Sequence, residues 1–290
     1  MRKILLLLLL FLSLPSSAFV EVREGQLYCD GRTWRPIGVN IHASTLEKRS
    51  FEVAAQYGWN SLRIMPENIS QLKQCVKWAK QKDLKLCVVV NPEFPIFELK
   101  NFSKKKEIWS WEVNSCSQAA LVRKHCPNHL IICEVEERRG GIEKLVDSAI
   151  MCESVDILSV SLLPLERGWV SSTNLYLGLR NCYMKSAELL KHISRRMSLV
   201  EKPLIVSACA YPRDKMFRLP ESVTSLRDSY FQFVLNYTFP DTGQHLGGVY
   251  FQRWELPQVG NADKHLTPMS IYPTDTITQR ILGLNKKCIE

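Results

Sequence analysis

Short apolar segments and longer amphipathic segments alternate along most of the chain. One short segment, residues 84–90, is apolar at every position from Leu86 on, as expected of a parallel strand covered on both faces. Between the short segments, apolar residues recur at the three- and four-residue spacing of an amphipathic helix. The predicted strands cover residues 34–40, 61–65, 84–90, 130–135, 156–163, 203–210 and 247–254. This order of elements predicts a parallel α/β fold.

The number of strands bears on which α/β fold forms. We expect a (β/α)8 TIM-barrel-like fold, which needs eight strands, whereas seven are recognised. Residues 91–129 and 164–202 each have room for a hidden strand, with residues 169–176 as one candidate; alternatively, one β/α unit is degenerate. A doubly wound sheet is the competing fold. It usually carries a Gly-rich phosphate loop after its first strand, and no glycine cluster follows Asn40 here.

The N-terminal region carries two further signals. Residues 1–18 combine a basic start, a leucine-rich run and small residues before a cleavage position, which predicts a secretory signal peptide. Residues 19–290 contain no linker or internal repeat, so we expect a single barrel domain. Its first segment, residues 19–33, holds an Asp30-Gly31 turn and predicts a β-hairpin that closes the bottom of the barrel. The protein is therefore expected to be secreted or periplasmic, without a membrane span after signal cleavage.

Composition and charge narrow the classes of partner. Hydrophobic residues make up 46% and charged residues 23% of the 290 residues, as in an ordinary globular protein. The net charge is +9, but the basic residues are dispersed, and their densest runs are Lys104-Lys105-Lys106 and Arg195-Arg196. Nucleic acid is therefore not an expected partner. No nucleotide-binding loop or metal-binding motif occurs, so we expect no cofactor and no metal.

Ten cysteines in a chain that is exported suggest disulfide bonds. Cys87, Cys133 and Cys209 lie inside apolar strand-like runs, where they are expected to be small core residues. The better disulfide candidates are Cys116, Cys126, Cys152, Cys182 and Cys288. Their spacing does not define which of them pair.

Several motifs follow one another in a recognisable order. After the predicted hairpin come RPIGVN at residues 35–40 and GWNSLRI at residues 58–64, and the last predicted strand reads GGVYFQRW at residues 247–254. This series resembles the clan-A glycoside hydrolases, especially the cellulase and β-mannanase family. The resemblance covers most of residues 19–256 and implies a barrel that acts on or binds a β-linked carbohydrate or polysaccharide.

The resemblance also implies where a catalytic site would lie. Retaining glycosidases place two carboxyl groups about 5–5.5 Å apart, one as acid/base and one as nucleophile. In the family, the acid/base glutamate follows an asparagine at the end of strand four. Residues 130–135 are the fourth predicted strand, so Glu137 is the best match for this role and Glu136 the second choice. The alternative is a solvated, charged loop. The residues expected to bind substrate are Arg63, Asn40, His42 and Trp254.

Some of these residues also have an ordinary structural interpretation. Arg63 could serve a buried ion pair, His42 an exposed loop and Trp254 the hydrophobic core, rather than a platform on which a sugar ring stacks. A Cys209 nucleophile assisted by His42 is conceivable, although nothing in the sequence indicates a lowered thiol pKa.

The position that the resemblance gives to the nucleophile holds Ala208, which has no carboxyl group. We therefore expect a carbohydrate-binding barrel, a pseudoenzyme whose standard retaining catalysis is impaired. One alternative is an active endo-β-glycosidase that uses Glu137 with a non-standard second carboxylate, for which Glu93, Asp214 and Glu255 are candidates. Another is a non-catalytic envelope or interaction protein that uses the barrel as a scaffold.

Overall fold

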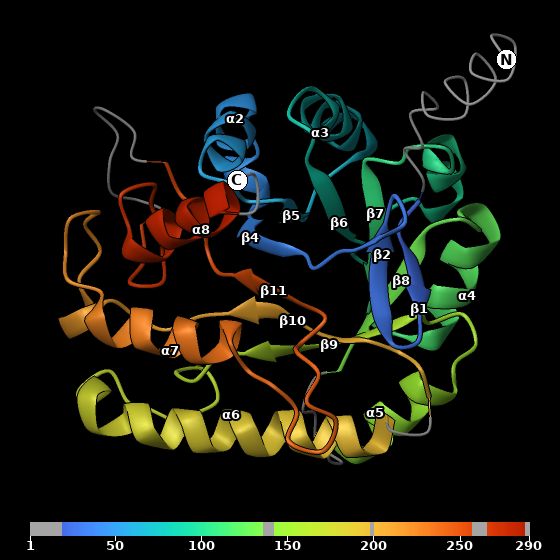
Figure 1. The fold of residues 1–290 in the computed structure, drawn as a ribbon. Helices are drawn as coiled ribbons and strands as arrows, with labels where there is room; N and C mark the ends of the chain where they lie inside the picture. Colours follow the sequence, from blue (N-terminus) through green and yellow to red (C-terminus); the bar gives the residue numbers. More distant parts are fainter. Residues whose placement is uncertain (1–18, 136–141, 198–199, 257–265, 288–290) are drawn as a thin grey trace, which may run out of the picture.

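The computed structural model describes residues 19–135, 142–197, 200–256 and 266–287 (Figure 1). Within them, eight parallel strands close into one barrel, in which the strands follow sequence order and the last is bonded back to the first. The strands are β4 Ile37–Ile41, β5 Ser61–Ile64, β6 Lys85–Val89, β7 Ile108–Val113, β8 Leu130–Glu134, β9 Ile157–Leu162, β10 Leu204–Cys209 and β11 Gly248–Phe251. This barrel confirms the predicted fold class. The predicted signal peptide, residues 1–18, lies outside the described residues.

Helices surround the barrel and cover the outer faces of its strands (Figure 1). The α-helices are α2 Lys48–Gln56, α3 Ile69–Gln81, α4 Cys116–His125, α5 Ile142–Met151, α6 Leu175–Met197, α7 Ser225–Leu235 and α8 Thr276–Lys287. In α3, for example, Ile69, Leu72, Cys75, Val76 and Ala79 recur at helical spacing and are buried. The 3-10 helices are η1 Ala43–Thr45, η2 Ile96–Phe102 and η3 Asp214–Met216. No helix in the described ranges is both long enough and apolar enough to cross a membrane.

The eighth strand is β7, which fills the first of the two long gaps in the predicted pattern. The alternative candidate, residues 169–176, is wrong, because this segment forms turns and the first turn of α6. The six residues of β7 read Ile-Trp-Ser-Trp-Glu-Val, and all six are buried. Because the serine and the glutamate interrupt the apolar run, the sequence pattern did not predict this strand. The buried charge of Glu112 is tolerated because Arg63 forms an ion pair with it inside the barrel.

The predicted hairpin is present and extends to three short antiparallel strands, β1 Glu21–Arg23, β2 Gln26–Cys29 and β3 Arg32–Thr33. Its two turns, at Glu24-Gly25 and Asp30-Gly31, both have positive φ angles, as tight hairpin turns require. The apolar side of the hairpin packs against a cluster of barrel residues that includes Trp109 and Tyr250. The hairpin therefore closes the N-terminal end of the barrel and leaves the C-terminal end as the mouth.

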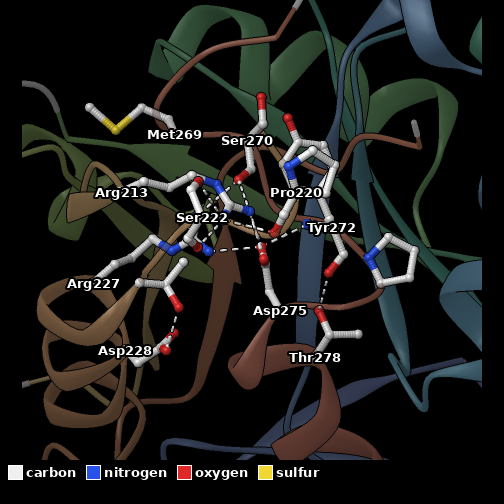
Figure 2. A network of polar contacts seen from close by, with 12 residues as sticks. Arg213, Pro220, Ser222, Arg227, Asp228, Met269, Ser270, Tyr272, Asp275 and Thr278 are labelled. Atoms are coloured by element: carbon white, nitrogen blue, oxygen red, sulfur yellow. Dashed lines mark hydrogen bonds and ion pairs between the residues drawn. The ribbon is translucent and has the colours of Figure 1, made fainter. Parts of the chain in front are cut away.

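A buried charge cluster fixes the segment between β11 and α8 (Figure 2). Arg213 donates two hydrogen bonds to Asp275, at 2.6 and 2.8 Å, and Arg227 donates one at 2.7 Å. The side chains of both arginines are 0% exposed and that of Asp275 is 1% exposed. Arg227 also donates to the carbonyl oxygen of Ser270 at 2.8 Å, which ties the chain before α8 to α7. We call Arg213, Arg227 and Asp275 the sealed cluster.

The nine described cysteines are free thiols, so the disulfides that we expected among the candidates are not formed within the described residues. Cys288 lies outside them. Cys87, Cys133 and Cys209 are buried in strands, which confirms them as core residues.

Candidate functional site

Three charged side chains, from strands β5, β7 and β8, meet inside the barrel near its mouth. Arg63 on β5 forms a bidentate ion pair with Glu112 on β7, in which Nε and Nη2 each lie 2.7 Å from a carboxylate oxygen. The same Nη2 atom lies 3.8 Å from Oε2 of Glu134 on β8. Both carboxylates therefore share one guanidinium group. We call Arg63, Glu112 and Glu134 the mouth cluster.

Burial and ion pairing act in opposite directions on Arg63. Burial would lower the pKa of its guanidinium group, but the adjacent carboxylates of Glu112 and Glu134 raise that pKa above its ordinary value. Arg63 therefore stays charged. Its position confirms the interpretation as a buried ion pair, while its contact with Glu134 still brings it to the mouth.

Glu134 is the member of the mouth cluster that reaches solvent. Its side chain is 18% exposed, compared with 2% for Glu112 and 8% for Arg63. Ser207 donates a hydrogen bond to its Oε1 at 3.1 Å, and Ser161 donates to the same oxygen. Burial and the nearby charge of Glu112 raise the pKa of Glu134, although Arg63 and the two hydroxyl groups act against this rise. A carboxyl group of this kind can act as a proton donor or as a hydrogen-bond partner for a ligand hydroxyl group.

Asn40 joins the wall of the same site. It pairs in register with Arg63 across β4 and β5, and its Nδ2 donates to the carbonyl oxygen of Ser207 at 3.1 Å. Its Oδ1 is buried and has no hydrogen-bond partner in the described structure. The structure thus brings together two of the predicted substrate-binding residues, Asn40 and Arg63.

His42 and Trp254 lie apart from this arrangement. His42 directly precedes η1 and most of its surface is exposed, while the partial burial of its ring and the charge of Arg253 lower its pKa. Trp254 is 0% exposed and packs edge-to-face on Trp59, with ring centroids 6.3 Å apart. A ring without exposed surface cannot stack on a sugar. The structure therefore gives Trp254 the role of a core residue, in place of the expected platform.

Glu136 and Glu137, the predicted acid/base residues, lie outside the described residues. The strand before them, β8, is the fifth of the barrel and not the fourth, because β7 had been missed. The fourth strand, β7, is followed by Asn114 and Ser115. The asparagine-then-glutamate pattern of the family therefore falls on Ser115. This serine caps helix α4 by accepting a hydrogen bond from the backbone N–H of Gln118 at 3.3 Å.

The nucleophile position lies on β10, the seventh strand of the barrel. Ala208 pairs in register with Ser161 of β9. The register shifts between Val206 and Ala208, and the side chain of this part of β10 that contacts the mouth cluster is Ser207, through its hydrogen bond to Glu134. Next to Ala208, Cys209 is fully buried, and burial raises the pKa of its thiol well above the ordinary value. This argues against the thiolate nucleophile considered above.

The alternative carboxylates are distributed around the barrel. Glu255 is buried and is bonded to Arg253, Glu93 is exposed after β6, and Asp214 accepts a hydrogen bond from the backbone of Leu226 at 3.2 Å. Within the described residues, neither Glu93 nor Asp214 forms a hydrogen bond or an ion pair with the mouth cluster.

Sequence reasoning missed Glu112 and Glu134. Glu112 was hidden with its strand, although the alternation Trp-Ser-Trp-Glu-Val is a period-two signal that predicts a half-polar strand. Glu134 was missed because the predicted acid/base residues, Glu136 and Glu137, lie two and three residues further along the chain. No group of three or more histidine, cysteine, aspartate or glutamate side chains in the described ranges is arranged to hold a metal ion.

Known structures share this architecture. A family 5 mannosidase from Rhizomucor miehei superimposes with a TM-score of 0.75 at 14% identity, covering 94% of this chain and 98% of the other. An endo-1,4-β-D-mannanase from Thermotoga petrophila gives a TM-score of 0.58 at 16% identity, with 88% and 100% covered. A β-glucuronidase from Ruminococcus gnavus gives 0.58 at 11% identity, with 91% of this chain and 51% of that one covered. These similarities establish the fold.

The family is established from the sequence. Comparison with curated protein sequences gave no match. Residues 97–264, more than half of the chain, match the family described as GH family 5 beta-mannosidase-like. The matched range includes β7, β8, β9, β10 and β11, and so holds Glu112, Glu134 and Ala208. The chain therefore belongs to the β-mannosidase-like proteins of glycoside hydrolase family 5.

Proposed function

We propose that this protein is a secreted, carbohydrate-binding member of family 5 in which standard retaining catalysis is impaired. The observation that carries the proposal is the residue identity at position 208, where the resemblance requires a nucleophilic carboxylate and the chain has an alanine at the end of β10. Ser115, at the position of the acid/base on the observed fourth strand, also has no carboxyl group. A retaining mechanism needs both groups.

The remaining polar groups suit binding of a neutral sugar. The partly exposed Glu134 carboxyl group and the hydroxyl groups of Ser161 and Ser207 beside it offer both hydrogen-bond donors and acceptors. Sugar hydroxyl groups need this mixture. The family and the mannosidase and mannanase neighbours favour a β-linked mannoside as the ligand. Secretion rests on the sequence of residues 1–18.

Calorimetric titration with β-1,4-mannohexaose, followed by product analysis of the same samples, tests the proposal. We expect the wild type to bind the oligosaccharide and to release no products. Glu134→Gln, which keeps the size of the side chain, should weaken binding by about tenfold, since a hydrogen bond to a charged group is worth about 1.5–3 kcal/mol. Turnover by the wild type would contradict the loss of catalysis, and absence of binding would contradict the ligand class.

Two matched double variants test whether the missing carboxyl groups account for the loss of catalysis. The double substitution Ser115→Glu with Ala208→Glu restores carboxyl groups at both positions, and Ser115→Gln with Ala208→Gln adds nearly the same volume without them. A positioned proton-transferring group typically contributes about 100-fold or more to the rate. We therefore expect measurable hydrolysis of mannohexaose by the glutamate pair alone. Equal rates in the two double variants would argue that these positions are not the lost catalytic ones.

A working hydrolase with unusual carboxylates is the second candidate. The observation that favours it is the raised pKa of Glu134, as expected of a general acid, next to the carboxylate of Glu112. Against it, the side chain of Glu112 is only 2% exposed and is fully engaged with Arg63, which leaves little access for a substrate. Wild-type turnover that is abolished by Glu134→Gln would favour this candidate, and turnover abolished by Glu137→Gln would favour the predicted acid/base.

A further inference from the structure

A second concave surface lies on the outside of the barrel, away from the mouth. It is a cavity of about 440 Å³ between α3 and the segment that joins η2 to β7. Four lysines line it, accompanied by a single acidic residue, Glu107. We call the cavity the lysine groove, and its lysines are Lys73, Lys77, Lys80 and Lys105.

The fold gathers these lysines from two separate parts of the sequence. Lys73, Lys77 and Lys80 follow one another at spacings of four and three residues, so they share one face of α3. The opposite face of the helix is buried against the barrel, which leaves the lysine face toward solvent. Lys105 completes the groove from a turn before β7. Its backbone N–H donates to Phe102 at 2.8 Å, and its carbonyl oxygen accepts a hydrogen bond from Ile108 at 3.2 Å.

The charge of the groove is not neutralised within the protein. All four lysines are exposed, and in the described part of the chain none of their ammonium groups forms an ion pair. In contrast, two lysines of the same region form ion pairs: Lys48 and Lys82 lie 3.5 and 3.4 Å from the Glu52 carboxylate. Like charges at one-turn spacing repel one another. An anionic ligand that follows the row would remove this repulsion.

The shape of the groove suits a chain more than a flat surface. The three lysines of α3 are spaced by about 6 and 4.5 Å along the helix axis, which is comparable to the length of one pyranose unit. The apolar residues of the floor, Val76 and Phe102, are 7% and 2% exposed. The groove therefore offers charges on its walls and no protruding apolar side chain of its own for insertion into a bilayer.

We propose that the lysine groove binds a linear anionic polysaccharide, with one carboxylate or sulfate near each lysine. It is separate from the mouth: Lys80 lies in the last turn of α3 and Lys105 precedes β7, so the groove extends toward the N-terminal end of the barrel. The mouth cluster lies at the C-terminal ends of the strands. The groove holds the protein on a charged polymer while the mouth remains open to a neutral sugar.

Binding of defined oligosaccharides to the full mature chain tests the proposal. The probes are polygalacturonate and heparin hexasaccharides, with mannohexaose as the neutral control. In Lys73→Gln/Lys77→Gln/Lys80→Gln, we expect the affinity for an anionic hexasaccharide to fall by about tenfold or more at low salt, because close charges are screened only weakly there. The matched control is Lys124→Gln/Lys185→Gln/Lys215→Gln, which removes the same charge elsewhere and should change the affinity less than about twofold.

The outcomes separate the groove from general electrostatics. Loss of anionic binding in the groove variant alone, with unchanged mannohexaose binding, supports the proposal. An equal loss in both triple variants would overturn it, because attraction would then follow net charge only. It would also be overturned if neither anionic hexasaccharide bound at low salt. Binding to phosphatidylglycerol vesicles that depends on the groove lysines, without hexasaccharide binding, would show a membrane surface instead and would equally overturn it.

Discussion

The mouth cluster and the sealed cluster are built from the same groups in opposite proportions. In the mouth cluster two glutamates share one arginine, whereas in the sealed cluster two arginines share one aspartate. The formal charge is negative in the first, when Glu134 is ionised, and positive in the second. Neither cluster is neutralised by ion pairing alone, so each needs further polar partners.

Those partners explain why one cluster is suited to binding and the other to stability. Backbone carbonyl oxygens of Pro220, Ser222 and Ser270 accept hydrogen bonds from the sealed arginines (Figure 2). Both arginine side chains are 0% exposed, so a ligand cannot reach them. In the mouth cluster, the hydroxyl groups of Ser161 and Ser207 face Glu134. Hydroxyl groups can reorient when a ligand arrives, and Glu134 retains exposed surface. A buried charge cluster thus becomes a candidate site when one member keeps access to solvent.

The largest expected loss of stability comes from a substitution in the sealed cluster. Asp275→Asn leaves two buried arginines without a carboxylate, and breaking a buried pair in this way costs about 4 kcal/mol of unfolding free energy. Denaturant unfolding followed by circular dichroism measures the change. The control is Asp147→Asn, which breaks the ion pair with Arg196 at the surface, where 53% of the Asp147 side chain is exposed, and should cost less than about 1 kcal/mol. Similar costs for the two variants would contradict the structural role of the sealed cluster.

A smaller effect is expected in the mouth cluster. Glu112→Gln removes the bidentate partner of Arg63, but Oε2 of Glu134 is already 3.8 Å from Nη2 and can take over. We expect the free energy of unfolding to fall by about 2 kcal/mol, which is typical of a lost hydrogen bond to a charged group. The same denaturant experiment gives the value. A loss as large as that of Asp275→Asn would mean that Glu134 does not compensate, and the contrast between the clusters would fail.

The smallest expected effect is the contribution of Glu134 to the pH dependence of folding stability. Its pKa is raised by burial and by Glu112, so the folded protein takes up a proton at higher pH than the unfolded chain. Stability therefore falls as pH rises from the ordinary glutamate pKa of about 4.3 through the raised pKa. The melting temperature of the wild type minus that of Glu134→Gln should decrease over this window. The exposed Glu93→Gln controls for the loss of one negative charge, and a difference that increases with pH would contradict the sign.

Much of the barrel could be predicted from local patterns, and the errors have a common cause. Seven strands and the hairpin follow from apolar runs and turn residues, which depend only on neighbouring positions. The missed strand, β7, is the one whose inward side chains are polar. Glu112 is stable there because Arg63, far away in the sequence, provides a partner. Because β7 was not predicted, β8 was counted as the fourth strand. The acid/base role was therefore assigned to Glu137 after β8, although the family position falls on Ser115 after β7.

The order of strands and helices, the hairpin, the family motifs and the alanine at residue 208 can all be read along the chain. Which charges meet depends on how the chain folds in space. Folding pairs Arg63 with Glu112, places Glu134 beside two hydroxyl groups, and collects dispersed lysines into one groove. Apolar periodicity is a local property of the chain, whereas the energy of a charge depends on its distance to other charges and to water. Those distances are defined only when the barrel closes.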